Sequence, residues 1–245
     1  MEGKNVTIDE KAFSSSSKLE NVSILSDKIK IGYQSFYYCS KLQNILINGS
    51  EAIIQSEAFY YCSKLKNILF ESPNLYIGNS IFRLCSNIIN VSIIGNIISY
   101  QKDIFGGPIQ NIKFSSENIT LTRELFNSFI GLKTITIECK NVTIGNQMFY
   151  SNSNIQEVLI KGDNILIGSS SFSGCTNLKT FLIKGNKTSI ENYAFYECSN
   201  LTNMTIEGDC ISVGYKSFYY CINIQNVLVL RNIISVGKNA FFAWI

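Results

Sequence analysis

Hydrophobic positions recur along this chain with a fixed period. Phenylalanine appears every 23 residues, with one shorter interval of 21 between Phe105 and Phe126. An aliphatic residue stands five positions before most of these phenylalanines, and Leu or Ile follows most of them by six. A strict period of this length is typical of proteins built from stacked coils. The phenylalanine column contains Phe13, Phe36, Phe59, Phe82, Phe105, Phe126, Phe149, Phe172, Phe195, Phe218 and Phe241.

Each repeat is predicted to contain two short strands and a bend. In the first strand, alternation places Ile45 and Ile47 inward and Asn44 and Leu46 outward. The second strand is an I-x-I or I-x-V element that is usually followed by glycine, as at Gly168. Glycine suits a corner that needs positive φ or a close approach of two backbones. The phenylalanine then falls on a bend that is too short for more than one 3₁₀ turn.

These elements predict a β-rich solenoid with two short parallel strands per coil. We expect a right-handed leucine-rich-repeat coil of about eleven repeats of 23 residues. Residues 1–245 are predicted to form a single solenoid that begins and ends in the middle of a repeat, with one short repeat of 21 residues around 105–126. One coil alone buries too little apolar surface to fold, so neighbouring coils must share a core.

The composite motif I-G-x-x-x-F-x-x-C-x-x-L-x-x-I-x-I runs intact from Ile31 to Ile47 and recurs from Ile167 to Ile183 with Phe181 in the next-to-last core position. This motif resembles the BspA-like leucine-rich repeat, and the resemblance covers almost the whole chain. It implies a solenoid that acts as an adhesin or ligand-binding module without enzymatic activity. It also implies a surface or secreted protein of anaerobic bacteria or mucosal protists.

Composition excludes several other classes of protein. Hydrophobic residues make up 46% of the chain and charged residues 16%, which argues against disorder. A net charge of +3 with scattered basic residues argues against nucleic acid. No stretch approaches the roughly 18 apolar residues of a membrane span. Histidine is absent, so the commonest general base and metal ligand is missing, and we predict no cofactor and no metal.

Two outward columns of the first strand are candidates for contact with a partner on a concave sheet. One column is rich in asparagine, which either binds a protein or glycan or forms hydrogen bonds with its own neighbours as a structural ladder. The other places Leu46 beside Leu69 and Leu159 beside Leu182, as small apolar patches. The predicted partner-binding residues are Asn44, Leu46, Asn67, Leu69, Glu157, Leu159, Thr180 and Leu182.

Tyrosines follow the phenylalanine in several coils and form a second candidate surface. Tyrosine offers a large contact area at low entropic cost, although some of these rings can simply cover the bend. The predicted tyrosine edge contains Tyr37, Tyr38, Tyr60, Tyr61, Tyr219 and Tyr220. Lys18, Lys41 and Lys64 align in three adjacent coils as a basic stripe. This stripe either meets sulfated or sialylated glycans or is an ordinary solvated rim.

Two further columns carry reactive groups but favour structural roles. Six cysteines stand three positions after the phenylalanine, and a spacing of 23 is not that of a zinc site. We interpret them as small, buried, reduced residues of the bend: Cys39, Cys62, Cys85, Cys175, Cys198 and Cys221. Asp103 and Glu124 share one column in adjacent coils. Their spacing permits a glycosidase-like pair, but a solvated surface pair is favoured.

The leading hypothesis is a non-enzymatic recognition or adhesion module at the cell surface or outside the cell. Its partner would be a protein or glycan on another cell or in the extracellular matrix, bound by the concave sheet and the tyrosine edge. A structural scaffold that stacks end to end is the alternative, because neither end of the chain shows a polar cap. A cytoplasmic location is the alternative to the cell surface. An enzyme acting on polysaccharide is the least favoured hypothesis.

Overall fold

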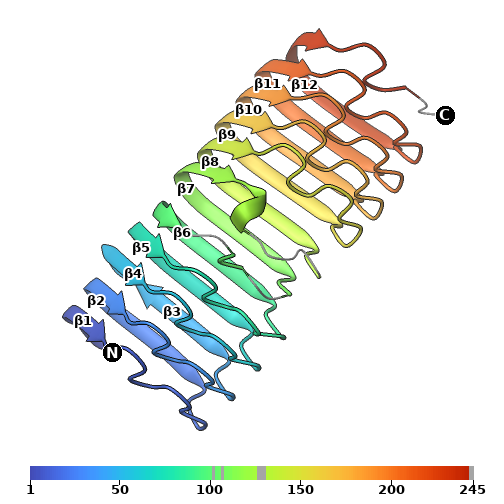
Figure 1. Ribbon diagram of the computed structural model, residues 1–245. Helices are drawn as coiled ribbons and strands as arrows, with labels where there is room; N and C mark the ends of the chain where they lie inside the picture. Colours follow the sequence, from blue (N-terminus) through green and yellow to red (C-terminus); the bar gives the residue numbers. More distant parts are fainter. Residues whose placement is uncertain (101–102, 106–107, 126–130, 243–245) are drawn as a thin grey trace. The chain divides into compact units, whose positions relative to one another are not determined.

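The repeats form the stacked coils of a β-solenoid in the computed structural model (Figure 1). The structure describes residues 1–100, 103–105, 108–125 and 131–242, so Phe126 of the phenylalanine column lies outside the described part. All described strand pairs are parallel, and most residues face the residue 23 positions later, as Asn21 faces Asn44. The short repeat appears as an offset of 21, with Asn90 opposite Asn111. The strands are β1 (Glu2–Ile8), β2 (Asn21–Ile31), β3 (Asn44–Asn48), β4 (Glu51–Ile54), β5 (Asn67–Ile77), β6 (Asn90–Tyr100), β7 (Asn111–Leu121), β8 (Thr134–Ile144), β9 (Glu157–Ile167), β10 (Thr180–Ile190), β11 (Asn203–Val213) and β12 (Asn226–Val236).

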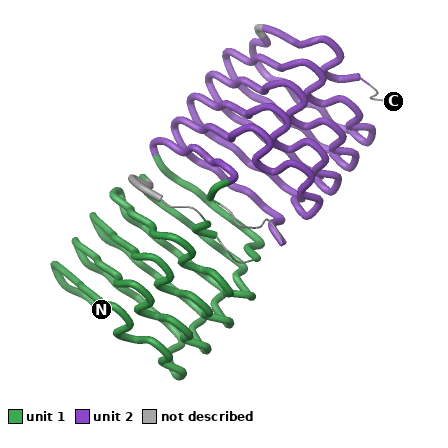
Figure 2. Tube along the Cα trace, viewed as in Figure 1, with its two compact units in different colours: residues 1–116, 124–130 green, residues 117–123, 131–245 purple. Residues whose placement is uncertain are grey.

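The coils group into two compact units (Figure 2). The first unit contains residues 1–116 and 124–130, and the second contains residues 117–123 and 131–245. In the first unit the sheet order is β1-β2-β3-β5-β6, followed by the first residues of β7, while β4 pairs with β2 and β5. In the second unit β8 to β12 follow one another in chain order. A single solenoid over residues 1–245 stays a prediction.

Each long strand has two legs that meet at a corner. In β2 the buried side chains are Val22, Ile24 and Ser26, then Ile29 and Ile31, and the two residues between these groups are both exposed. Alternation therefore slips by one position at the corner, and both legs present apolar side chains to one core. We call the residues before the corner the first leg and those after it the second leg. In most coils the two predicted strands are the two legs of one strand of 11 residues. Among the described strands, β3 and β4 are the two legs of one coil that remain separate strands.

The phenylalanine column forms the centre of the core. In the second unit Phe172 is fully buried, and its ring centroid lies 5.0 Å from that of Phe149 and 5.1 Å from that of Phe195. The backbone N–H of Phe172 donates to the carbonyl oxygen of Ala194 in the next coil at 2.7 Å. Hydrogen bonds between neighbouring coils therefore join the bends as well as the strands. They consist of consecutive turns, and among the described residues a 3₁₀ helix occurs at η1 (Arg123–Leu125).

Glycine after the second leg is required by the close approach of neighbouring coils. A Cβ atom at Gly168 would lie 2.7 Å from the carbonyl oxygen of Ile144 and 2.6 Å from Oδ1 of Asn146. The φ angle of Gly168 is not in the left-handed region. Of the two reasons predicted for this glycine, close approach is therefore the one that applies.

Core columns become exposed at β12. Met204 and Val213 of β11 are 1% and 3% exposed, whereas the equivalent Val227 and Val236 of β12 are 43% and 50% exposed. No further described coil covers these side chains. Burial in this fold therefore comes from the neighbouring coil and not from the coil's own residues.

The stacked core predicts a large cost for removing one ring. Replacing Phe172 with alanine deletes a fully buried side chain between two stacked neighbours. We expect the free energy of unfolding to fall by about 3–5 kcal/mol, as for other buried aromatic residues. Urea denaturation followed by circular dichroism measures this change. The control Tyr150→Ala, at a position that is 50% exposed, should cost less than about 1 kcal/mol. Equal losses in the two variants would contradict the assigned core.

Candidate binding surfaces

The tyrosine edge of the first unit is a double row of stacked rings on the bends. The ring centroids of Tyr37 and Tyr60 lie 5.4 Å apart with an interplanar angle of 17°. Those of Tyr38 and Tyr61 lie 4.8 Å apart with an angle of 20°. Tyr38 is 45% exposed and Tyr61 is 38% exposed. The bends therefore present an ordered aromatic surface to solvent.

Backbone geometry explains why these rings point outward. Tyr38 and Tyr61 have φ angles of 58° and 59°, in the left-handed region that non-glycine residues rarely adopt. The N–H of Tyr38 donates to the carbonyl of Tyr60 at 2.9 Å, and the N–H of Tyr61 donates to the carbonyl of Arg83 at 2.9 Å. These bonds between coils offset the cost of the left-handed residues. The tyrosine directions are thus set by the solenoid backbone.

The second unit carries a similar but more compact cluster. Tyr196 and Tyr219 stack with ring centroids 5.7 Å apart, and Tyr220 meets Tyr219 edge-on at 4.5 Å. Nζ of Lys216 lies 4.5 Å from the centroid of the Tyr219 ring, which is a cation–π distance. Tyr220 is 43% exposed. Each unit therefore has its own tyrosine edge, and the two clusters occupy the same repeat positions.

The asparagine column of the first leg is a hydrogen-bonded ladder. In the first unit, Nδ2 of Asn44 donates to Oδ1 of Asn21 at 2.7 Å, and Nδ2 of Asn67 donates to Oδ1 of Asn44 at 2.8 Å. The ladder continues through Asn90 and Asn111 at 2.8 Å per step. The structural role predicted for this column is confirmed by these bonds. Binding of a partner by the same amides stays a prediction.

The outward leucines lie beside one another in the predicted pairs. Leu46 faces Leu69 in the first unit, and Leu159 faces Leu182 in the second. All four side chains are half-buried, because neighbouring parallel strands shield them. Glu157 is exposed and Thr180 is half-buried on the same face. These residues form small mixed patches, one in each unit.

The basic stripe is exposed. Lys18, Lys41 and Lys64 are all exposed, and none forms an ion pair with a described residue. Other lysines are compensated, as Lys161 is by Glu138 at 3.1 Å. An uncompensated row of cations attracts anionic groups, although exposed charges are strongly screened.

The cysteine column is buried and reduced. The Sγ of each of the six cysteines donates to a carbonyl 26 residues earlier, as Cys175 does to Phe149 at 3.2 Å. Burial raises the pKa of Cys175 to about 12 and raises the pKa of Cys198 well above its ordinary value. All eight cysteines are free. The predicted role as small residues of the bend is confirmed.

Two other features bear on catalysis and membranes. The backbone N–H of Asp103 donates to the carbonyl of Glu124 at 2.8 Å, so these acids lie in register in neighbouring coils, as the sequence predicted. Among the described residues no group of three metal-ligating side chains gathers at one place. None of the described helices is long and apolar enough to cross a membrane.

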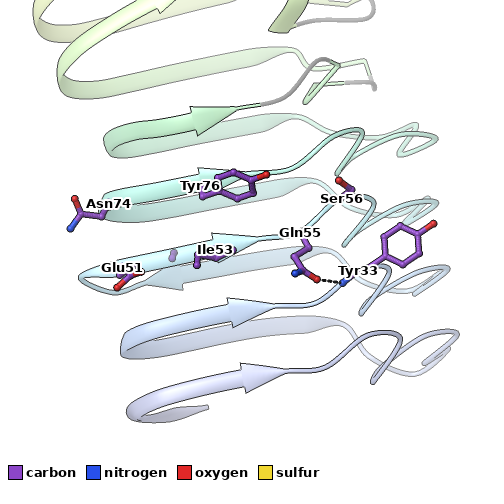
Figure 3. Close-up of a pocket in the computed structure, with 8 residues that line it drawn as sticks. Tyr33, Glu51, Ile53, Gln55, Ser56, Asn74 and Tyr76 are labelled. Atoms are coloured by element: carbon purple, nitrogen blue, oxygen red, sulfur yellow. Dashed lines mark hydrogen bonds between the residues drawn. The ribbon is translucent and has the colours of Figure 1, made fainter.

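Sequence reasoning missed a groove on the second legs of the first unit (Figure 3). Its volume is about 810 Å³, and it is lined by Tyr33, Glu51, Ala52, Ile53, Gln55, Ser56, Asn74 and Tyr76. We call it the second-leg groove. One lining residue, Gln55, interrupts the glycine column between Gly32 and Gly78. The sequence predicted partner-binding residues on the sheet at first-leg positions such as Asn44 and Leu46.

Parallel strands stacked in 23-residue coils around an aliphatic and phenylalanine core define a leucine-rich-repeat protein. The chain belongs to the BspA-type leucine-rich repeat family, whose six-copy repeat region matches residues 6–133, 101–188 and 142–244. Among solved structures it is similar to a leucine-rich repeat protein from Bacteroides ovatus ATCC 8483. That match has 20% identity and a TM-score of 0.44, and it covers 98% of this chain and 76% of the other. No curated protein matches the chain.

The buried thiols predict a selective labelling pattern. At pH 8 the six column cysteines should resist iodoacetamide in the native protein, because they are buried and the raised pKa keeps thiols such as Cys175 protonated. Cys210 is half-buried and should react first, and all eight cysteines should react after unfolding in urea. Peptide mass spectrometry assigns the labelled sites. Rapid native labelling of Cys62 or Cys198 would contradict the assignment.

Proposed function

We propose that this protein is a non-catalytic recognition module that binds a protein or glycan partner through the tyrosine edge and the first-leg face. The observation that carries the proposal is the pair of exposed, stacked rings Tyr38 and Tyr61. These rings form an apolar surface that the folded protein leaves exposed to solvent. Contact with a partner would explain its presence.

The order of the tyrosine edge favours tight recognition. Rings whose direction is set by the backbone lose little conformational entropy when a partner covers them. Tyrosine also combines an apolar ring with a hydroxyl group that forms hydrogen bonds at an interface. The edge therefore supplies contact area and specificity from the same side chains.

The first-leg face and the basic stripe extend this surface in the proposal. The half-buried pairs Leu46/Leu69 and Leu159/Leu182 would supply apolar contact. The exposed Lys18, Lys41 and Lys64 would favour a partner with anionic groups, such as a sulfated or sialylated glycan. The partner would lie on another cell or in the extracellular matrix. Digestion of the protein by protease added to intact source cells tests this location.

End-to-end self-association is a second candidate function. It is supported by the exposed inward side chains of β12, among them Val227 and Val236. A further coil or a second copy would bury them, as β12 buries the core residues of β11. Sedimentation at increasing protein concentration tests this candidate. A constant monomer mass would count against it, and Val227→Lys should abolish any association.

Removing exposed rings of the tyrosine edge should weaken partner binding with little effect on the stability of the fold. In the variant Tyr38→Ala/Tyr61→Ala we expect binding to intact epithelial cells and to immobilised matrix proteins to fall at least about tenfold. Both rings are exposed, so the melting temperature should change by only a few degrees. Flow cytometry and biolayer interferometry of labelled protein measure the binding.

Two matched variants locate the rest of the surface. Leu159→Glu/Leu182→Glu introduces charge on the first-leg face, and Lys41→Ala/Lys64→Ala removes most of the basic stripe. Binding that falls in the leucine variant and is unchanged in the tyrosine variant would move the site to the first-leg face. If wild-type protein binds and no variant weakens it, the proposed surface is wrong.

A further inference from the structure

The second-leg groove of the first unit is a separate surface from the tyrosine edge and combines apolar and polar lining groups. Glu51, Ile53 and Gln55 follow one another along and just after β4, and Asn74 and Tyr76 lie on the next coil (Figure 3). Tyr76, Ile53 and Gln55 are half-buried and belong to outward columns. This groove therefore has an aromatic and aliphatic floor with polar groups along its rim.

Gln55 of the groove stands between two glycines of neighbouring coils. The N–H of Gln55 donates to the carbonyl of Ile31, and the N–H of Gly78 donates to the carbonyl of Ile54, so Gly32, Gln55 and Gly78 are neighbours in three successive coils. A Cβ atom at Gly32 would lie 2.6 Å from the backbone nitrogen of Glu10. At Gly78 it would lie 2.4 Å from that of Ser56. Backbone packing therefore excludes side chains at both glycines, so Gln55 is the one residue of these three that contributes a side chain to the groove.

Polar groups of the groove are held in place by bonds to the backbone. Oε1 of Gln55 accepts from the N–H of Tyr33 at 2.9 Å, which fixes the amide and leaves its Nε2 as a donor. Nδ2 of Asn74 donates to the carbonyl of Ser50 at 3.2 Å, which leaves its Oδ1 as an acceptor. The lining of the groove thus includes an oriented donor and an oriented acceptor.

The charge of the groove favours a neutral ligand. Glu51 is the single charged lining residue, and Nζ of Lys28 lies 4.0 Å from its Oε2. A smaller adjoining hollow of about 280 Å³ shares Glu51 and Ile53 and carries Lys28 and Lys30. The main groove itself has no basic lining residue, so it lacks the groups that would hold a sulfate, phosphate or carboxylate.

We propose that the second-leg groove binds a neutral oligosaccharide. A sugar ring has an apolar C–H face that stacks on tyrosine and a rim of hydroxyl groups that exchange hydrogen bonds with amides. Tyr76 and Ile53 match the face, and Gln55 and Asn74 match the rim. A volume of about 810 Å³ lies within the range of ligand sites and has room for a few sugar residues.

The test uses the whole protein and neutral hexasaccharides of glucose, mannose, xylose and N-acetylglucosamine, titrated by isothermal calorimetry. At least one hexasaccharide should bind, with an affinity that is the same at low and high salt. Tyr76→Ala and Gln55→Ala should each weaken it about tenfold or more, as expected for loss of one well-packed contact. Circular dichroism confirms that each variant is folded, and Tyr76→Phe should retain most of the affinity.

Control variants separate this site from the tyrosine edge. Leu166→Ala alters the same repeat position in the second unit, and Tyr38→Ala/Tyr61→Ala alters the edge, so both should bind the hexasaccharide normally. Failure of all four hexasaccharides to bind would overturn the proposal. Binding only by sulfated glycans with strong salt dependence, or binding that is unchanged in folded Tyr76→Ala and Gln55→Ala, would overturn it as well. None of these outcomes decides whether the tyrosine edge binds its own partner.

Discussion

The packing of each coil against its neighbours is the constraint on which the rest of this structure depends. Phe172 is buried by rings 5.0 and 5.1 Å away in the adjacent coils, and its N–H is satisfied by the next coil. Where no described coil follows, an inward residue such as Val236 is half exposed. Stability is therefore a property of interfaces between repeats, and inward columns stay mostly apolar through the stack.

The same constraint turns outward residues into rows. A side chain at one repeat position lies beside its equivalents in the next coils, so asparagines form a ladder and tyrosines form stacked rings, while glycines allow neighbouring coils to approach closely. Outward rows are free to change without disturbing the core. In the proposed function, the rows would therefore contact the partner, while the core columns do not indicate what the partner is.

The period of the chain was enough to predict the coils, the inward columns and the buried cysteines, because each depends on spacing alone. Spacing could not decide between two roles for the asparagines, since a bond such as that from Asn44 to Asn21 depends on side-chain torsion angles. Spacing also did not show that the two legs form one bent strand. This depends on strand pairing that continues through the corner. The second-leg groove was missed because it is formed by outward side chains of neighbouring coils, such as Tyr33, Ile53 and Tyr76, and spacing alone does not give the directions of these side chains.

The central claim is that a shared phenylalanine core fixes an exposed tyrosine edge on the bends. Hydroxyl-radical footprinting of the native protein, read by mass spectrometry, tests both parts in one measurement. The account predicts fast modification of Tyr38, Tyr61 and Tyr220 and strong protection of Phe36, Phe59 and Phe172, with the difference lost on unfolding. Protected tyrosines or rapidly modified phenylalanines in the native protein would contradict the account.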